Sequence, residues 1–142
     1  MTENPTEKLT GSLIGTDIAI CGRTCRITAL LGRGKSAYSW LATDGSQRFV
    51  YKKMHQEAVE HYTFGNKLMA EVEAFTRLSL AGAPVPRLLE WSDSDQYLVK
   101  EFVEGDIAAD LAAEGRLTDE HFFQAWSFYE KLRDAGLHVD YF

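Results

Sequence analysis

Short apolar segments, each ending at glycine or at a turn signal, fill residues 17 to 54 and constrain the fold more than any other feature of the chain. They read DIAICG, RITALLG, AYSWLATDG and QRFVYKKM. The pair Asp44-Gly45 is a common hairpin turn between antiparallel strands. This part of the sequence therefore predicts three to four antiparallel strands.

The rest of the chain predicts helices around a further pair of strands. A helical stretch from Glu57 to Leu80, with a break at TFGN, ends at AGAPVP, because glycine and proline do not continue a helix. The segments RLLEWS and QYLVKEFVE form two strands joined by the turn DSD. Asp106 is placed to cap a short helix that Gly115 ends. A longer helix runs from Thr118 to Ala135.

Length and composition exclude several classes of protein. With 142 residues, of which 45% are apolar, the chain can bury one ordinary core, as one compact unit or as two small lobes. A net charge of -6 leaves no broad basic surface, so nucleic acid is not an expected partner. No apolar run is long enough to cross a bilayer, and the first residues, MTENPTEKLTGS, are polar. We therefore expect no membrane span and a cytoplasmic location.

The two cysteines show no pattern of a metal site or a disulfide. Cys21 and Cys25 have no histidine or cysteine at metal-ligand spacing. Positions four apart on a strand share a face at a distance of about 13 Å, which is too far for a disulfide. We expect both to be reduced packing residues, and we predict no metal site.

Two adjacent lysines follow a strand pattern in which one of them faces covered surface. Side chains on a strand alternate between its two faces. One lysine of RFVYKKMH therefore points inward, unless its ammonium group reaches water along the aliphatic stem. The alternation gives two sets, with Val50, Lys52 and Met54 on one face and Phe49, Tyr51 and Lys53 on the other.

A glutamate lies inside an apolar helical stripe. At 3.6 residues per turn Glu71 shares one face with four apolar residues, while Glu73 faces the opposite way. An ionised, unpaired carboxylate in a core destabilises the fold by several kcal/mol. Glu71 is therefore expected to remain hydrated, to be protonated or to pair with a cation. A lysine from the preceding sheet is the nearest candidate in sequence, and a purely structural ion pair is the alternative. The four apolar residues are Leu68, Val72, Phe75 and Leu78.

The stretch ITALLGRGKSAYSWLA places Gly32 and Gly34 between two strand-like runs. Glycines at this spacing occur in phosphate-binding loops and also in ordinary hairpin turns. The loop by itself does not show whether it is a phosphate-binding loop or a hairpin turn. The residues that follow it must distinguish these two alternatives.

Taken together, the glycine loop, the strand lysine, the helix glutamate and the segment QYLVKEFVEG resemble the small lobe of protein-kinase-like phosphotransferases. In that family the glycine-rich turn covers ATP, the lysine grips the phosphates and pairs with the glutamate, and the hinge after the fifth strand hydrogen-bonds adenine. The similarity spans nearly all of residues 27 to 142. It is closer to compact bacterial members, such as the lipopolysaccharide-kinase and RIO-like families, than to large regulated kinases.

The resemblance assigns roles to individual residues. FVYK is similar to the family's V-A-I-K, which implies that Lys52 is the phosphate lysine and Val50 the wall against adenine. EVEAFTRL implies that Glu71 is the partner of the lysine. The further nucleotide-binding residues that it implies are Gly32, Arg33, Gly34, Lys35 and Ser36 in the loop, and Glu101, Phe102 and Val103 in the hinge.

The resemblance extends to the segment FYEKLRDAGLHVDYF, which is similar to the helix leading into the catalytic loop. It implies that His138 is a packing histidine and that Asp140 is the catalytic aspartate, which accepts the proton of the acceptor hydroxyl. The acceptor is a protein, a sugar or a small molecule, and nothing in the sequence selects among them.

Four features depart from the family pattern. Ala37 replaces the third glycine, and Ser39 stands where an apolar residue covers adenine, so reduced nucleotide affinity is expected. Lys100 stands before the hinge, where a bulky apolar residue backs the pocket, and either points outward or supplies a second cation. The chain ends at Phe142, before the asparagine and the D-F-G that hold Mg²⁺ in the family. ATP and Mg²⁺ are thus the implied cofactors, but without those ligands efficient transfer is not expected.

We predict an α+β fold. Residues 1–12 form a flexible tail, residues 13–104 a kinase-like small lobe with a five-stranded antiparallel sheet and one main helix, and residues 105–142 the hinge exit and a helical start of the large lobe. The expected function is the ATP-binding part of a kinase-like phosphotransferase, incomplete in this chain. A catalytically inactive kinase-like module that binds nucleotide or protein, and an unrelated α+β binding domain, are the alternatives. An uncovered helix Thr118 to Ala135 would favour self-association.

Overall fold

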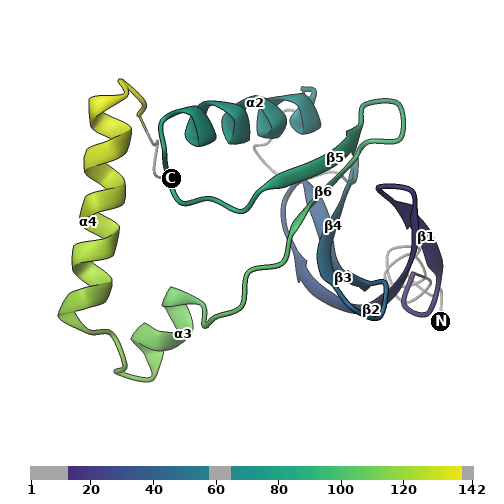
Figure 1. Ribbon diagram of the computed structural model, residues 1–142, viewed down its shortest axis with the longest axis horizontal. Helices are drawn as coiled ribbons and strands as arrows, with labels where there is room; N and C mark the ends of the chain where they lie inside the picture. The colour runs from purple at the N-terminus through teal and green to yellow at the C-terminus, as the bar shows by residue number, and fades with distance from the viewer. Residues whose placement is uncertain (1–12, 58–64, 139–142) are drawn as a thin grey trace. The chain divides into compact units, whose positions relative to one another are not determined.

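The computed structural model describes residues 13–57 and 65–138, and these form an α+β fold in which a curled antiparallel sheet precedes most of the helical structure (Figure 1). The chain divides into two compact units. The first consists of the residues up to Glu73 together with Pro86–Phe102, and it contains the sheet. The second consists of Ala74–Val85 together with Val103–Phe142.

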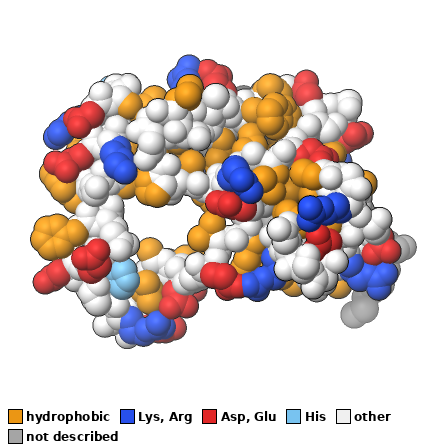
Figure 2. Space-filling view, in the orientation of Figure 1, with side chains coloured by type: hydrophobic (Ala, Val, Ile, Leu, Met, Phe, Trp, Pro, Cys, Tyr) orange, Lys and Arg blue, Asp and Glu red, His pale blue; other side chains and the backbone are white. Residues whose placement is uncertain are grey.

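Charged side chains of both signs are interspersed on the face that Figure 2 displays. In the part of the chain that the structure describes, no helix is long and apolar enough to span a membrane.

The described residues form six strands, whereas the sequence predicted five. The order across the sheet is β1-β2-β3-β4-β6-β5, and every neighbouring pair is antiparallel. The strands are β1 (Asp17–Ile20), β2 (Arg23–Arg33), β3 (Ala37–Thr43), β4 (Arg48–Met54), β5 (Leu88–Ser92) and β6 (Tyr97–Glu101).

All four of the first segments form strands, where the sequence predicted three to four, and β1 and β2 are joined by a tight turn. Cys21 and Gly22 both have positive φ, 49° and 75°, and Ile20 pairs with Arg23, so the two residues form a tight hairpin of the kind that matches strand twist. This turn separates β1 from β2. It also leaves Cys21 exposed, so its prediction as a packing residue was wrong, whereas Cys25 is buried as expected. Both cysteines are free.

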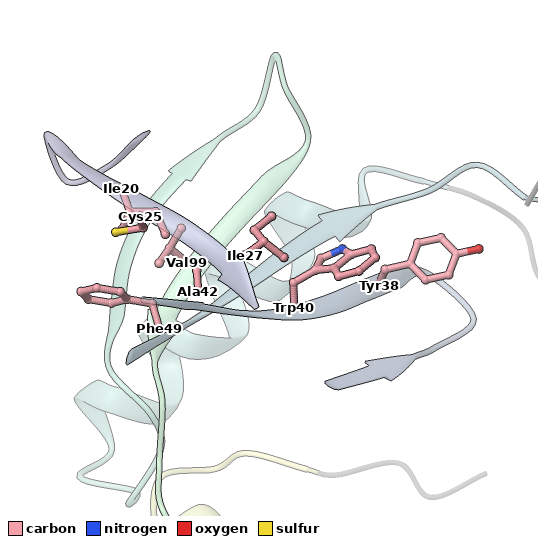
Figure 3. Packing of buried hydrophobic residues seen from close by; sticks show 8 residues of the cluster. All are labelled: Ile20, Cys25, Ile27, Tyr38, Trp40, Ala42, Phe49 and Val99. Atoms are coloured by element: carbon pink, nitrogen blue, oxygen red, sulfur yellow. The ribbon is translucent and has the colours of Figure 1, made fainter. Parts of the chain in front are cut away.

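The sheet is curled, and a side chain of edge strand β5 reaches the β1–β2 turn. The Glu90 carboxylate on β5 accepts a hydrogen bond of 2.6 Å from the Cys21 amide in the β1–β2 turn, and a second one, also 2.6 Å, from the Tyr97 hydroxyl. Larger apolar side chains fill one face of the curled sheet, and Trp40 is only 1% exposed (Figure 3). The buried members of this core are Ile20, Cys25, Ile27, Tyr38, Trp40, Ala42, Phe49 and Val99.

Helix α2 (Lys67–Leu80) packs on the other face of the sheet. The sequence predicted a helical stretch from Glu57. His55–Glu57 have no regular structure, residues 58–64 lie outside the described part, and Asn66 caps the helix by accepting a hydrogen bond from the Met69 amide. Gly82, with φ of 74°, ends the helix at AGAPVP as predicted. The buried residues of this second core are Ala37, Met54, Leu68, Val72 and Leu98.

The second unit contains helices α3 (Ala108–Ala113) and α4 (Asp119–Asp134). Asp106 was predicted to cap α3, but Ile107 holds the cap position without a side-chain hydrogen bond. The Asp106 carboxylate instead pairs with Arg116 at 2.9 Å. The prediction for α4 is confirmed, because Thr118 caps its start and Gly136, with φ of 70°, follows its end.

One side of α4 is apolar and exposed. Exposed fractions range from 49% for Tyr129 to 70% for Phe123. Leu132, in contrast, is buried, and Lys131 donates a hydrogen bond of 3.4 Å to the Gly82 carbonyl in the same unit. A shallow groove on the exposed side is lined by Asp119, Phe122, Phe123, Ala125, Trp126 and Tyr129.

Candidate functional site

The sheet register aligns the glycine loop with the strand lysine on the face that carries α2. Gly32 on β2 lies opposite Ser39 on β3, and Ser39 lies opposite Lys52 on β4. Because neighbouring strands are about 4.8 Å apart, the backbone of Gly32 lies about 10 Å from that of Lys52. Gly32, Ser39 and Lys52 therefore lie in one row across three strands. The resemblance assigned Gly32 and Lys52 to the nucleotide, and Ser39 departs from the family pattern.

Lys52 and Glu71 form a two-pronged ion pair between β4 and α2. The Lys52 ammonium lies 2.8 Å and 2.7 Å from the two carboxylate oxygens of Glu71. The side chains are 21% and 23% exposed, so the pair is half-buried and still reachable from solvent. Glu71 extends from a helix face whose neighbours Leu68 and Val72 are buried. The carboxylate thus fixes the position of the ammonium group.

The strand alternation expected from the sequence is confirmed. Lys53 points to the opposite side from Lys52, where its ammonium donates to the Asp95 carbonyl. Phe49 and Tyr51 contact the first core, and Met54 belongs to the second. Of the two adjacent lysines, Lys52 is the one that reaches the helix.

Lys100 on β6 lies on the same face as Lys52. It is directly opposite Val50 on β4 and Leu88 on β5, while Lys52 is opposite Leu98, two residues earlier on β6. Burial, followed by the repulsion of Lys52, lowers the pKa of Lys100, and attraction to Glu71 offsets part of this shift. The sequence left open whether Lys100 points outward or toward the pocket. In the structure its side chain shares a face with that of Lys52.

The turn between β2 and β3 consists of Gly34, Lys35 and Ser36, and residues beyond β4 hold it in place. The Gly34 amide donates to the Ala37 carbonyl at 2.8 Å, which closes the turn. His55 donates to the turn twice, from Nε2 to the Gly34 carbonyl at 2.9 Å and from its amide to the Ser36 carbonyl at 3.0 Å. The loop is thus a braced hairpin turn.

A buried lysine adds a second brace. The Lys67 ammonium donates to the His55 carbonyl at 2.5 Å and to the Ser36 carbonyl at 3.4 Å. Lys67 is 8% exposed, and burial lowers its pKa. Neither Lys67 nor His55 was predicted from the sequence. The only signal was a lysine that directly precedes the apolar stripe of α2, next to Leu68.

The two glycines of the loop are not required by the fold. Neither Gly32 nor Gly34 has positive φ. A Cβ atom at Gly32 would meet nothing within 4 Å, and one at Gly34 would meet only the Ala37 carbonyl oxygen, at 3.6 Å. Both positions tolerate a side chain, so the space beside the backbone is open to a ligand.

The turn is flanked by a further charged network. Glu57 accepts from the Tyr38 hydroxyl and lies 3.3 Å from Arg33, and the Tyr38 and His55 rings are 5.0 Å apart. Hydrogen bonding to Tyr38 lowers the pKa of Glu57. Arg33, which the resemblance assigned to the nucleotide, therefore pairs with Glu57 in this structure, while Lys35 is exposed.

The remaining predicted site residues lie on β4, at or just after the end of β6, and after α4. Val50 is 9% exposed, and Glu101, opposite Phe49, donates from its amide to the Arg87 carbonyl at 3.0 Å. Phe102 lies under the Arg48 guanidinium at 4.7 Å, and Val103, 59% exposed, is the first residue after β6 that belongs to the second unit.

The residues assigned to the catalytic loop follow α4 in the chain. His138 is exposed beyond α4, and Asp140 lies outside the described residues. Across residues 13–57 and 65–138, no three carboxylate, histidine or cysteine side chains lie close enough together to hold a metal ion.

The face as a whole presents a fixed ammonium group, a second lysine, an apolar strip and an open glycine backbone. Such a combination suits an anionic ligand with an apolar part, because half-buried charge acts more strongly than charge in water. Comparisons of the chain with protein-family models and with curated proteins found no match.

Proposed function

We propose that the face around Lys52 binds ATP, and that the chain provides the nucleotide-binding part of a kinase-like phosphotransferase acting on a hydroxyl acceptor. The observation that supports this most is the two-pronged ion pair between Lys52 and Glu71. It joins the strand lysine and the helix glutamate that the resemblance assigned to phosphate binding. The curled antiparallel sheet with one helix on its face is the arrangement expected of that family's small lobe.

A role in binding accounts for this pair better than a role in stability. Partly exposed ion pairs typically stabilise a fold by less than about 1 kcal/mol. Holding Lys52 with both oxygens of Glu71, however, gives the ammonium a defined position from which it can contact phosphate oxygens. The open backbone at Gly32 lies in the same row of the sheet.

Under this proposal Val50 supplies the apolar surface for the base, and Lys52 neutralises phosphate charge. The transfer step in this family also needs Mg²⁺ and an aspartate that takes the acceptor proton. Asp140, which the resemblance assigns to that step, lies outside the described residues. Binding and transfer are therefore tested separately.

Titration of the chain with a fluorescent ATP analogue, with and without Mg²⁺, tests the proposal. We expect saturable binding with a Kd of about 0.1 to 1 mM, because the face supplies contacts but no metal ligands of its own. Lys52→Met should weaken binding about tenfold, as expected for the loss of one charge-assisted contact. Lys53→Met, on the opposite face of the same strand, is the matched control and should bind like the original chain.

Two results would contradict the proposal. One is the absence of saturable binding at millimolar nucleotide by a chain that is shown to be folded. The other is equal loss of affinity in Lys52→Met and Lys53→Met, because that would mean that general charge, and not the Lys52 face, governs binding.

The exposed side of α4 favours a second candidate, a catalytically inactive kinase-like module that binds a protein. Phe122, Phe123 and Trp126 are 63%, 70% and 57% exposed, and exposed aromatic clusters of this kind mark interaction surfaces. This candidate predicts that a chain without measurable ATP affinity still associates through α4. Loss of that association in Trp126→Ala, with nucleotide titration as the parallel assay, separates the two functions.

A further inference from the structure

The β2–β3 turn is attached to both elements that carry the Lys52–Glu71 pair. His55 follows β4, three residues after Lys52, and Lys67, the first residue of α2, lies about one helical turn before Glu71. His55 donates to the turn from its amide and from its ring, and the Lys67 ammonium donates to the Ser36 carbonyl. Both attachments of the turn therefore lie close in sequence to the residues that form the ion pair.

A buried ammonium group joins the three segments at one point. The Lys67 ammonium donates to two main-chain carbonyls, that of His55 at 2.5 Å and that of Ser36 at 3.4 Å. The Ser36 carbonyl also accepts from the His55 amide, at 3.0 Å. Lys67 is only 8% exposed, so water competes little for these charge-assisted hydrogen bonds. They connect the start of α2, the segment after β4 and the turn.

A turn that contains glycine depends on such contacts for a defined shape. Glycine has more backbone freedom than any other residue, so Gly34 by itself does not restrict the turn. Its amide donates to the Ala37 carbonyl at 2.8 Å, and its carbonyl accepts from the His55 ring at 2.9 Å. A turn that is already ordered binds a ligand more tightly than one that must become ordered on binding. Side chains outside the turn thus determine how well it can bind.

We propose that Lys67 is a positioning residue, which holds the β2–β3 turn in a fixed place relative to Lys52 so that both contact one phosphate chain. Lys67 acts through the turn and does not itself touch the ligand. The inference rests on the proposed function and deepens it, because it assigns the order of the phosphate-binding turn to a residue of α2. The same helix then fixes the Lys52 ammonium, through Glu71, and the turn.

Amide hydrogen exchange of the free chain, followed residue by residue by NMR, tests the positioning itself. In Lys67→Met we expect the amides of His55 and Gly34, which donate within the attached turn, to exchange about tenfold faster. The Gln47 amide, in the turn between β3 and β4, should exchange as before. Lys53→Met is the matched control, because it removes another lysine that donates to a main-chain carbonyl, and it should change none of these rates.

ATP titration of the same variants tests the consequence for binding. We expect Lys67→Met to weaken ATP binding about tenfold in a chain that thermal unfolding shows to be folded. A lysine that only stabilised the fold would leave the affinity of the folded chain unchanged. Lys67→Gln, which keeps a neutral donor, gives the same test with a smaller expected loss if Lys67→Met does not fold.

A double-mutant cycle shows whether Lys67 acts through the turn. Gly34→Ala is expected to block the approach of phosphate to the turn, so adding Lys67→Met to it should weaken ATP binding little further. Equal losses with and without Gly34→Ala would mean that Lys67 acts independently of the turn, and this result would overturn the inference.

The remaining results separate this inference from the proposed function. If Lys52→Met weakens ATP binding and folded Lys67→Met does not, Lys67 does not position the turn for the ligand and the inference fails alone. If the folded original chain binds no ATP, the proposed function fails. In that case faster exchange of the His55 and Gly34 amides in Lys67→Met still supports the positioning of the turn, and unchanged exchange overturns it.

Discussion

Glu90 shows how one side chain can join the two edges of a sheet. Its carboxylate accepts hydrogen bonds from the Cys21 amide and from the Tyr97 hydroxyl. Burial by itself raises the pKa of Glu90, but these hydrogen bonds outweigh it, so the pKa lies below its usual 4.5. The hydrogen bond that the Tyr97 hydroxyl donates to Glu90, together with burial, raises the pKa of Tyr97 to about 12. The charged form of Glu90 is therefore the one that stabilises the fold.

We expect Glu90→Gln to lower the free energy of unfolding by about 1 to 2 kcal/mol at pH 7, since charge-assisted hydrogen bonds contribute about that much. A group with a lowered folded-state pKa stabilises the fold above its unfolded pKa, and this contribution is lost as pH falls through the folded value. The difference between the two proteins should therefore shrink below pH 4.5. Urea unfolding at pH 7 and at lower pH measures it. A constant difference across this range would show that the charge of Glu90 is not involved.

A matched control for this experiment is Glu114→Gln. Glu114 pairs with Arg116 at 2.6 Å, but both side chains are more than half exposed, so solvent screens the pair. We expect little change in stability at either pH. If Glu114→Gln lowered the free energy of unfolding as much as Glu90→Gln does, the effect would not be specific to the hydrogen bonds of Glu90.

The fold does not explain why glycines occur in and beside the β2–β3 turn. The turn is held by hydrogen bonds from His55 and Lys67, and neither Gly32 nor Gly34 is needed for backbone conformation or packing. A role of these glycines in ligand approach is therefore testable apart from stability.

Gly32→Ala and Gly34→Ala should leave the chain as stable as before or stabilise it by up to about 1 kcal/mol, because alanine restricts the unfolded chain and fits both positions. Each should weaken ATP binding, because the added methyl group occupies the space that a phosphate would approach. Thermal unfolding and nucleotide titration of the same samples check both parts. Gly45→Ala, at a positive φ of 94°, should instead destabilise the chain and leave binding unchanged. Unchanged ATP affinity in both loop variants would count against a phosphate role for the loop.

Elements with a local, periodic signal were predictable from the sequence, and contacts between distant segments were not. Alternation along β4 predicted that one of the two adjacent lysines faces inward, the resemblance chose Lys52, and helical spacing placed Glu71 on the buried side. The sequence separated DIAICG from RITALLG at the glycine but predicted only three to four strands in this region, whereas the structure has four and turns at Cys21, with a positive φ that cysteine rarely adopts. The Asp106 cap was wrong because Arg116, ten residues later, binds that carboxylate. The bond from Cys21 to Glu90 spans 69 residues and leaves no local pattern.

The molecule as a whole carries a net charge of -6 and an exposed aromatic surface on one helix. Acidic side chains, including Asp119 in the groove, lie beside the aromatic residues of α4. Apolar association and charge repulsion therefore act in opposite directions on this surface.

We expect the chain to self-associate weakly through α4, and more strongly at higher salt, since salt screens the repulsion and leaves apolar contact intact. Phe122→Ser combined with Trp126→Ser should abolish the concentration dependence of the sedimentation coefficient. Both side chains are more than half exposed, so their replacement should not unfold the helix. Leu80→Ser, at an 85% exposed position outside α4, is the control. Association that persists in the double variant would place the contact elsewhere.

The contrast between Trp40, which is 1% exposed, and Trp91 and Trp126, which are 48% and 57% exposed, gives the chain built-in optical reporters. Trp40 lies in the sheet-bearing unit and Trp126 in the other. With Trp91 replaced by phenylalanine, each unit keeps one indole, and the buried one should emit at shorter wavelength until its surroundings open to water. Coincident or separate changes of the two signals along a denaturant series would show whether the units unfold in one cooperative step.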